Sequence, residues 1–397
     1  MLQTPPATET SDVLAVMDDW GPEKVVCVSD TRTGMRGVLV IDNTARGIGK
    51  GGTRMSPTVT VTEIARLARV MTLKWAAVDM FYGGAQAGIA ADPAAGDKEA
   101  VLRAFARALH NEVPAEYVFG LDMGLTEDDA AVILDEIGRS GVVGTPAVLG
   151  GLPYDQLGIT GLGVAEAAHA AAQWADLDLA GSRVAVQGFG AVGAAASTRL
   201  VELGATVCAV STTLGCLYNP TGLDTAALLS LRDVFGDALV EHYPDAQRLD
   251  LGAELLADVD ILVPAATQDV IDDDTARDIK ARIVVEGANL PTSAAAQQLL
   301  HERGILLVPD FIANAGGVIA AGYAMDSRQS AFRPDPEPVR STVANKLRAN
   351  TVTVLDAARR TGATTHDSAR ALARGRVHAA MAARRRLPTA AAPARRS

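Results

Sequence analysis

The feature that most constrains the fold is a series of short apolar runs between about Gly181 and Pro309, separated by stretches rich in alanine and leucine. The runs lie in "SRVAVQGFG", "ATVCAVS", "DILVPAA", "ARIVVEGA" and "GILLVPD". Parallel strands joined by crossover helices have this pattern, because they are buried on both faces. The sequence therefore predicts a doubly wound α/β domain in this region.

The first of these runs leads into a glycine-rich turn. In "GFGAVG", Gly188, Gly190 and Gly193 have G-x-G-x-x-G spacing around Ala191 and Val192, and a helical stretch follows. Such glycines allow a tight turn and a close approach of the backbone to a pyrophosphate, which the N–H groups of the helix start then bind. Because a strand precedes the turn and a helix follows it, we expect a dinucleotide site here.

The end of the second run bears on which dinucleotide binds. Folds that prefer NAD usually place Asp or Glu about 20 residues past the glycines, to hold the ribose 2′-hydroxyl. This chain has Ser211, Thr212 and Thr213 there and no acid. Hydroxyl groups permit NADP, whereas an acid supplied by another loop would favour NAD, so both cofactors remain open.

Composition limits the class of protein. A chain of 397 residues is long enough for two domains, and its net charge of −11 argues against a nucleic-acid partner. Cys27, Cys208 and Cys216 lack the spacing of a zinc site or a disulfide framework, so we expect no metal and a reducing, cytoplasmic location. No apolar run approaches the length of a membrane span, and we expect no membrane partner.

Lysine is scarce, with six residues among 36 lysines and arginines, so ordinary surface positive charge is carried by arginine. Two of the six have unusual settings. Lys50 lies in a glycine-flanked turn, and Lys74 lies inside the apolar run "VMTLKWAAVDM". A buried, unpaired ammonium is costly, and a compact ammonium suits carboxylate binding. We therefore expect Lys74 to face a polar site.

Taken together, "GKGGTRMSP", "MTLKWAAVD", "YGGAQAGIAADP", "YVFGLDMGLTEDD", "VAVQGFGAVG", "VEGANLPTS" and "VPDFIANAGGVI" resemble the glutamate, leucine, phenylalanine and valine dehydrogenase family, the glutamate branch most. The resemblance implies an α/β protein of two domains, with a homo-oligomeric assembly. It places a substrate-binding and oligomerisation domain at 1–150 and a Rossmann-type dinucleotide domain at 151–330. A helical segment at 331–397 would return to the first domain and end in a disordered basic tail.

The resemblance also assigns roles on the substrate side. Lys74 matches the lysine that binds the substrate α-carboxylate, and Asp122 matches the aspartate that moves a proton to and from the amino group. Lys50 matches a position that is lysine in enzymes binding a side-chain carboxylate, and Gly52 belongs to the same substrate-binding segment. The implied ligands are an α-amino acid and its 2-oxo acid, with a carboxylate in the side chain.

On the cofactor side, the resemblance assigns NAD or NADP to a site that includes Thr160, Ala265 and Ala266. Asn289, in "EGANLP", and Asn314, in "IANAGG", match positions that hold the cofactor or the amino-acid end of the substrate. Asparagine and threonine also cap helices and close turns, so a structural role is the alternative for each.

Gln86 is the departure from the family, which has lysine between those glycine pairs. A crowded, partly desolvated lysine has a lowered pKa and can activate water, whereas a glutamine amide does not titrate. Loss of a general base typically costs about 10²- to 10⁴-fold in rate. The sequence predicts an amino-acid dehydrogenase with impaired or altered deamination. An inactive homologue or an engineered Lys-to-Gln variant, which binds ligands without turnover, is the alternative.

Overall fold

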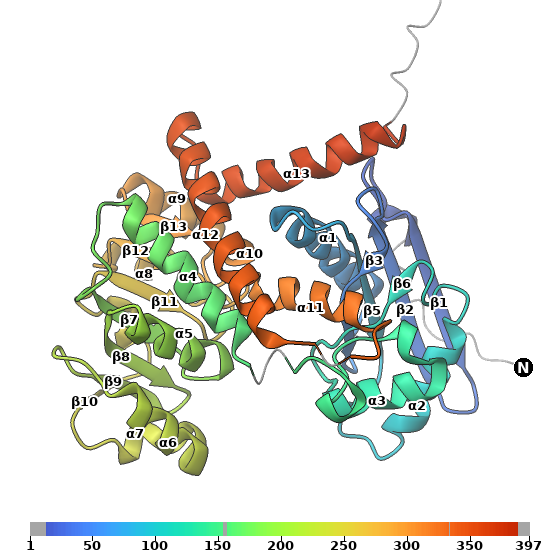
Figure 1. Ribbon diagram of the computed structural model, residues 1–397, viewed down its shortest axis with the longest axis horizontal. Coiled ribbons are helices and arrows are strands. Elements are labelled where there is room, and N and C mark those ends of the chain that lie inside the picture. Colours follow the sequence, from blue (N-terminus) through green and yellow to red (C-terminus); the bar gives the residue numbers. More distant parts are fainter. Residues whose placement is uncertain (1–12, 154–156, 333, 388–397) are drawn as a thin grey trace, which may run out of the picture. The chain divides into compact units, whose positions relative to one another are not determined.

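The computed structural model describes residues 13–153, 157–332 and 334–387, and these form two compact units (Figure 1). The first unit contains the residues up to Gly151, the segment Arg328–Ala331 and the residues from Gly375 onward. The second contains Leu152–Ser327 and Phe332–Arg374. No helix among the described residues is long and apolar enough to cross a membrane.

The first unit is built on a six-stranded sheet in the order β1-β2-β5-β3-β6, with β4 paired to β5. Strands β3 and β4 pair in parallel with β5, and β6 pairs in parallel with β3. Strand β2 pairs with β5 in the antiparallel direction, and β1 pairs with β2 in the same way. The strands are β1 (Lys24–Asp30), β2 (Met35–Asn43), β3 (Gly49–Lys50), β4 (Thr53–Met55), β5 (Gly83–Ile89) and β6 (Tyr117–Val118). The helices are η1 (Val13–Val16), α1 (Val61–Ala77), α2 (Lys98–Ala108), α3 (Glu127–Ile137), η2 (Arg139–Gly141) and η3 (Ala147–Leu149).

Helices cover both faces of this sheet, and the alternation of side chains in the strands decides which residues face which helix. Ala85, Ala87 and Ile89 of β5 belong to a core shared with α2 and α3. On the other face, a Cβ added to Gly84 would lie 2.0 Å from Thr72 Oγ1 in α1, so only glycine allows this helix to pack so closely. Gln86 has the same parity as Gly84 and therefore faces α1.

The second unit confirms the doubly wound prediction. Its seven-stranded sheet has the order β10-β9-β8-β7-β11-β12-β13, and the five strands from β8 to β13 in this order are parallel. The strands are β7 (Arg183–Gln187), β8 (Thr206–Thr212), β9 (Gly215–Tyr218), β10 (Gln247–Leu249), β11 (Ile261–Pro264), β12 (Ile283–Val285) and β13 (Leu306–Val308). The five apolar runs of the sequence are the five parallel strands.

Helices surround the second sheet. They are α4 (Ile159–Trp174), α5 (Ala191–Glu202), α6 (Thr225–Phe235), η4 (Gly236–Ala238), α7 (Leu239–His242), η5 (Ala253–Leu256), α8 (Asp273–Asp278), α9 (Ala294–Glu302), α10 (Asp310–Ala313) and α11 (Gly316–Ser327). Helix α12 (Pro336–Thr361) runs beside α4 in Figure 1 and packs along it.

The expectation that 331–397 returns to the first domain needs a correction. Residues Phe332–Arg374, including all of α12, belong to the second unit, because α12 buries an apolar stripe there that includes Val339, Val343 and Leu347. Helix α13 (Thr365–Ala383) begins in the second unit, and its part from Gly375 onward belongs to the first. The predicted basic tail begins with Arg384, Arg385 and Arg386, which are described, and Arg386 donates to Glu23. The rest of that tail, from 388 on, lies outside the described residues.

Candidate active site and dinucleotide site

Gln86 lies in the middle of β5 with only 3% of its surface exposed. Its side-chain amide makes two hydrogen bonds. The carbonyl Oε1 accepts the backbone N–H of Gly52 at 2.9 Å, and Nε2 donates to Asp122 Oδ2 at 2.6 Å. The structure thus joins two predicted catalytic positions directly, and the amide holds the Asp122 carboxylate in one orientation.

Asp122 follows β6 and accepts a second hydrogen bond, from Arg54 Nε at 3.2 Å. Arg54 lies in β4 and also donates to Glu63 Oε1 at 2.8 Å. Burial lowers the pKa of Arg54, but the charges and hydrogen bonds of Asp122 and Glu63 outweigh it and raise the pKa overall. The sequence reasoning did not single out Arg54, although it lies within the quoted segment "GKGGTRMSP".

Lys50 ends β3 and is buried, with 3% of its surface exposed. Its Nζ donates to the carbonyl oxygen of Gly51 at 2.9 Å. Burial, and secondarily the positive charge of Arg328, lowers the pKa of Lys50 to about 7. A Cβ added to Gly120 would lie 2.2 Å from this Nζ and 2.8 Å from Gly51 O, so a side chain there would displace the lysine. The ammonium lies in a space shaped by backbone groups, where a carboxylate ligand would stabilise its charge.

Lys74 is half-buried in the last turn of α1. The next residue, Trp75, is fully buried and donates its indole N–H to the backbone oxygen of Lys50 at 2.9 Å. The end of α1 is therefore fixed to the strand that carries Lys50. The structure thus brings the element of Lys74 next to that of Lys50.

Glycines 51 and 52 allow the backbone to approach Gln86 and Asp122. A Cβ on Gly51 would lie 1.6 Å from Ala85 O, and one on Gly52 would lie 2.7 Å from the Cβ of Asp122. Tyr117 Oη donates to Gly52 O at 3.0 Å, and burial together with the Asp122 charge raises the pKa of this phenol. Tyr117 therefore stays a neutral donor at neutral pH.

The glycine-rich turn of the second unit has the geometry that a pyrophosphate needs. Gly188 has φ +83°, and a Cβ on it would lie 2.8 Å from Ala266. A Cβ on Gly193 would lie 1.8 Å from Gly188 O, whereas one on Gly190 would meet no atom within 4 Å. Gly190 caps α5, whose first turn contains Ala191 and Val192. Protein atoms thus pack closely against Gly188 and Gly193, whereas the space beside Gly190 is open, which fits the dinucleotide prediction.

Two of the predicted cofactor residues follow β11, the strand that pairs with β7. Ala265 and Ala266 come directly after β11, and the backbone N–H of Ala265 donates to Gln187 O at 2.9 Å. Because Gln187 ends β7 just before Gly188, the structure brings both alanines to the glycine-rich turn.

Ser211 does not have the role that the sequence suggested. Its hydroxyl accepts the backbone N–H of Gly188 at 3.0 Å and donates to the buried Glu254 at 3.0 Å. The side chain is 1% exposed and both of its hydrogen-bonding functions are used within the protein. Ser211 therefore shapes the glycine-rich turn from behind instead of contacting a ribose.

An acid does lie at the end of β8, although it comes from another part of the chain. Thr212 Oγ1 donates to the backbone oxygen of Asp237 at 2.8 Å, and Thr213 Oγ1 donates to its carboxylate. Asp237 is exposed and lies in η4. This is the alternative in which another loop supplies the acid, and sequence spacing gave no signal for it.

Asn289 and Asn314 are neighbours. Asn314 Nδ2 donates to Asn289 Oδ1 at 3.0 Å, and it also lies within hydrogen-bonding distance of Gly287 O and Ala288 O, at 3.3 and 3.2 Å. Thr160, in the first turn of α4, lies beside the start of α11, because a Cβ on Gly317 would be 3.0 Å from its Oγ1. Asn314 thus has a structural function, since its amide holds the loop after β12.

The comparisons with known proteins agree with this geometry. Residues 22–139 match the family described as Glu/Leu/Phe/Val dehydrogenase, dimerisation domain, and residues 150–385 match Glutamate/Leucine/Phenylalanine/Valine dehydrogenase. The chain belongs to this dehydrogenase family. Its fold and family are those of an amino-acid dehydrogenase, and the glycine-rich turn lies in the second unit.

Individual relatives of the dehydrogenase include the NAD-specific glutamate dehydrogenase of Staphylococcus aureus, 37% identical over 322 residues that cover 77% of this chain and 76% of the relative. A hetero-hexameric glutamate dehydrogenase from Thermus thermophilus, solved in a Leu-bound form, has a TM-score of 0.80 and 33% identity, with 93% and 92% of the two chains covered. The L-tryptophan dehydrogenase of Nostoc punctiforme has a TM-score of 0.70 and 27% identity, with 91% and 97% covered.

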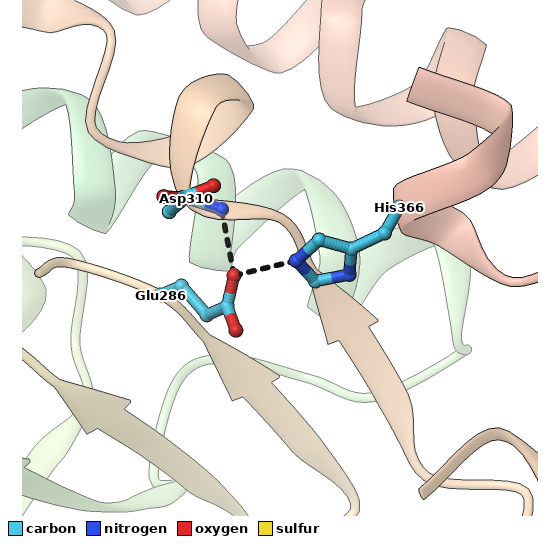
Figure 2. A group of neighbouring side chains, drawn as sticks. All are labelled: Glu286, Asp310 and His366. Carbon is cyan, nitrogen blue, oxygen red and sulfur yellow. Dashed lines mark hydrogen bonds and ion pairs between the residues drawn. The ribbon is translucent and has the colours of Figure 1, made fainter. Parts of the chain in front are cut away.

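One further cluster of titratable groups lies in the second unit of the dehydrogenase. Figure 2 shows Glu286, which follows β12, with Asp310 at the start of α10 and His366 at the start of α13. His366 Nε2 lies 2.9 Å from Glu286 Oε2, and the same oxygen accepts the backbone N–H of Asp310 at 2.8 Å. Among the described residues, these three carry atoms close enough together to hold a metal ion.

Hydrogen bonds account for most of this cluster without an ion. The Asp310 carboxylate accepts the backbone N–H groups of Leu290 and Phe311, at 2.8 and 2.7 Å. Both of its oxygens and Glu286 Oε2 are therefore engaged by protein donors. We assign the three side chains a structural function, since they fasten β12, α10 and α13 to one another.

Proposed function

We propose that the chain is an NAD-dependent dehydrogenase of glutamate or a similar amino acid with a side-chain carboxylate, in which deamination is slow. The observation that supports this most is the setting of Gln86. Its amide holds Asp122 at 2.6 Å, and the buried Lys50 is bonded to the same Gly51–Gly52 peptide group, yet position 86 has no group that can take a proton. The site retains the parts for binding and proton transfer at nitrogen and lacks the base.

Separate residues bind the substrate, exchange its proton and hold the cofactor. Lys74 binds the α-carboxylate and Lys50 the side-chain carboxylate, so the amino acid is held at both ends. Asp122, oriented by Gln86 and Arg54, exchanges a proton with the substrate nitrogen. NAD, bound along Gly188, Gly190 and the start of α5, supplies the acceptor for the hydride of the α-carbon.

NAD is favoured over NADP by Asp237. Its exposed carboxylate lies beside the Thr213 hydroxyl at the end of β8, where the adenosine ribose of a dinucleotide is expected. A carboxylate accepts hydrogen bonds from a ribose diol and repels a 2′-phosphate. The Staphylococcus aureus relative is NAD-specific by name, which supports the same choice.

Gln86→Lys is the decisive variant. We expect it to raise the rate of NAD reduction with glutamate by about 10²- to 10⁴-fold, because the lysine restores a base for activating water. Absorbance at 340 nm measures the rate for the parent chain, for Gln86→Lys and for Gln86→Met as the matched control. A parent chain that deaminates glutamate as fast as Gln86→Lys would contradict the proposal.

A second function is supported by the same residue. A subunit that binds ligands without turnover would serve as a partner of an active subunit in a mixed assembly, and the Thermus thermophilus relative is hetero-hexameric by its title. In that case the parent chain binds NADH and 2-oxoglutarate in a fluorescence titration but shows no turnover in either direction. Reduction of a cyclic imine such as pyrroline carboxylate, abolished by Asp122→Asn, would favour the active enzyme instead.

A further inference from the structure

The peptide group between Gly51 and Gly52 lies between Lys50 and Gln86. Its carbonyl oxygen accepts a hydrogen bond from Lys50 Nζ at 2.9 Å. Its N–H, on Gly52, donates to Gln86 Oε1 at 2.9 Å. The Gln86 amide then donates through Nε2 to Asp122 Oδ2 at 2.6 Å. Three hydrogen bonds through two amide groups therefore connect a buried ammonium to a carboxylate.

The direction of every bond in this chain is fixed by chemistry. An ammonium and a backbone N–H only donate, and a carboxylate only accepts, so the orientation of the Gln86 amide has one solution. All donors consequently point from Lys50 toward Asp122. Hydrogen bonds arranged head to tail polarise one another, and here the cation is at the donor end and the anion at the acceptor end.

Only a glutamine completes this connection at position 86. A lysine, which the family resemblance implies at this position, donates to Asp122 but has no acceptor for the Gly52 N–H. A glutamate accepts that N–H but, when ionised, has no proton to donate to Asp122. A methionine of nearly the same shape does neither.

We propose that Gln86 is a positioning residue that couples Lys50 to Asp122. The inference rests on the proposed function in one respect, namely that Lys50 binds the side-chain carboxylate of the substrate. A carboxylate that pairs with Lys50 Nζ offsets the positive charge of the ammonium, so the ammonium polarises Gly51 O less. The change passes along the chain, so Asp122 responds to whether the bound substrate carries a side-chain carboxylate.

Other charged and titratable groups surround the chain and are kept in every variant below. Arg54 contacts Asp122 and is paired with Glu63. The Arg328 charge acts on Lys50, and the Tyr117 hydroxyl donates to Gly52 O. Because these groups are constant, a difference between variants at position 86 reports the connection itself.

The test follows the titration of Lys50 in the full-length protein without cofactor or substrate. Trace reductive methylation with formaldehyde and a hydride donor, at a series of pH values, labels the neutral amine. Peptide mass spectrometry then gives the pKa of each of the chain's lysines, and those other than Lys50 serve as internal references. Four chains are compared, namely the parent, Asp122→Asn, Gln86→Met and the double variant.

We expect Asp122→Asn to lower the pKa of Lys50 in the parent, because it removes the anion at the acceptor end. In the Gln86→Met background only the interaction through space remains. The decrease in the pKa of Lys50 should then be smaller by about 0.3, which is roughly a twofold difference in the acid dissociation constant, because the polarised hydrogen bonds no longer contribute. The same decrease in both backgrounds would overturn the proposal.

Two further variants are included, one as a second way to break the connection and one as a control. Gln86→Lys breaks the link to Gly52 and keeps the donor to Asp122. Because the new ammonium adds a charge of its own, this variant is compared with Gln86→Lys/Asp122→Asn, and the decrease in the pKa of Lys50 between the two must again be smaller than in the parent. Gln297→Met is the matched control, since Gln297 is also buried and donates to Thr292 O in the second unit. It must leave the titration of Lys50 unchanged. The titration needs no turnover, so failure to find the coupling leaves the proposed function intact. Conversely, a Gln86→Lys enzyme without activity would contradict the proposed function and leave the coupling intact.

Discussion

The imidazole Nε2 of His366 lies 2.9 Å from Glu286 Oε2, and the two side chains are only 3% and 1% exposed. The contact spans 80 residues of sequence and joins the start of α13 to the end of β12. A buried pair of this kind is a weak source of net stability, but each partner makes the burial of the other tolerable. Its two members should therefore respond to mutation as a unit.

His366→Leu should destabilise the protein by roughly 3–5 kcal/mol, because it leaves the Glu286 carboxylate buried without its partner. The double variant Glu286→Leu/His366→Leu should be more stable than His366→Leu alone, since it leaves no uncompensated charge. Denaturant unfolding followed by circular dichroism measures both. The exposed His301 provides the control, and His301→Leu should change the free energy of unfolding by less than about 0.5 kcal/mol. Additive losses from the two single replacements would contradict this view of the pair.

The lowered pKa of Lys50 predicts a specific pH dependence of stability. Its pKa is about 7 in the folded protein and near 10.5 in the unfolded chain, so the unfolded state binds more protons between these values. The cost of burying the ammonium is complete below pH 7 and disappears as the pH rises toward 10.5.

Lys50→Met should therefore stabilise the protein by a few kcal/mol, about 2–5, at pH 6, and the gain should decline steadily above pH 7. Thermal unfolding of parent and variant from pH 6 to 10 measures the difference. Lys24→Met serves as control, because Lys24 is half-exposed and paired with Glu112 and Glu116. A gain for Lys50→Met that is constant across this range would show that Lys50 is not the titrating group.

Asp237→Ser should weaken the preference for NAD. Removal of the carboxylate beside Thr213 eliminates the repulsion of a 2′-phosphate, so the affinity for NADPH should rise by about tenfold or more while the affinity for NADH falls. Quenching of protein fluorescence by each cofactor gives the two dissociation constants. Asp233→Ser, at an exposed acid in the preceding helix, is the matched control. Unchanged affinity for NADPH in Asp237→Ser would place the ribose elsewhere.

Gly190 and Gly193 should respond in opposite ways to the same change. Gly190→Ala adds a methyl group to open space at the start of α5, so thermal stability should hold while NADH binding weakens by at least about tenfold. Gly193→Ala forces a Cβ to 1.8 Å from Gly188 O and should destabilise the second unit itself. Melting temperature and NADH titration separate the two effects. Full NADH affinity in Gly190→Ala would mean that the phosphates do not approach this face.

The parallel part of the second sheet was predictable because its strands are apolar on both faces and lie between helical stretches. The antiparallel edge, β9 and β10, was not. Residues Thr213 and Leu214 join β8 to β9, and this turn has none of the Asn-Gly or Asp-Gly chemistry that marks a hairpin in sequence. Strand β10 has three residues, too few for a period to be recognised.

Several residues of the candidate site could be identified from the sequence, but the contacts between them could not. Lys50, Gln86 and Asp122 stand out in the sequence through their settings and the family resemblance. The bond between Gln86 and Asp122 spans 36 residues and exists because β3, which precedes Gly51 and Gly52, pairs with both β5 and β6. Long-range partners also explain why Ser211 was misassigned, since its acceptor Glu254 is 43 residues away.

The path of α13 has a consequence for how the protein is made. Arg376 donates to the carbonyl oxygens of Ala76 and Ala77 at the end of α1, and Arg386 contacts Glu23. These contacts complete the first unit. The two arginines that make them are synthesised after the whole of Leu152–Arg374. The unit that begins the chain is therefore completed last, and until then the end of α1 that fixes Lys50 lacks its outer hydrogen-bond donors. Nascent chains should therefore acquire the second unit before the first is complete.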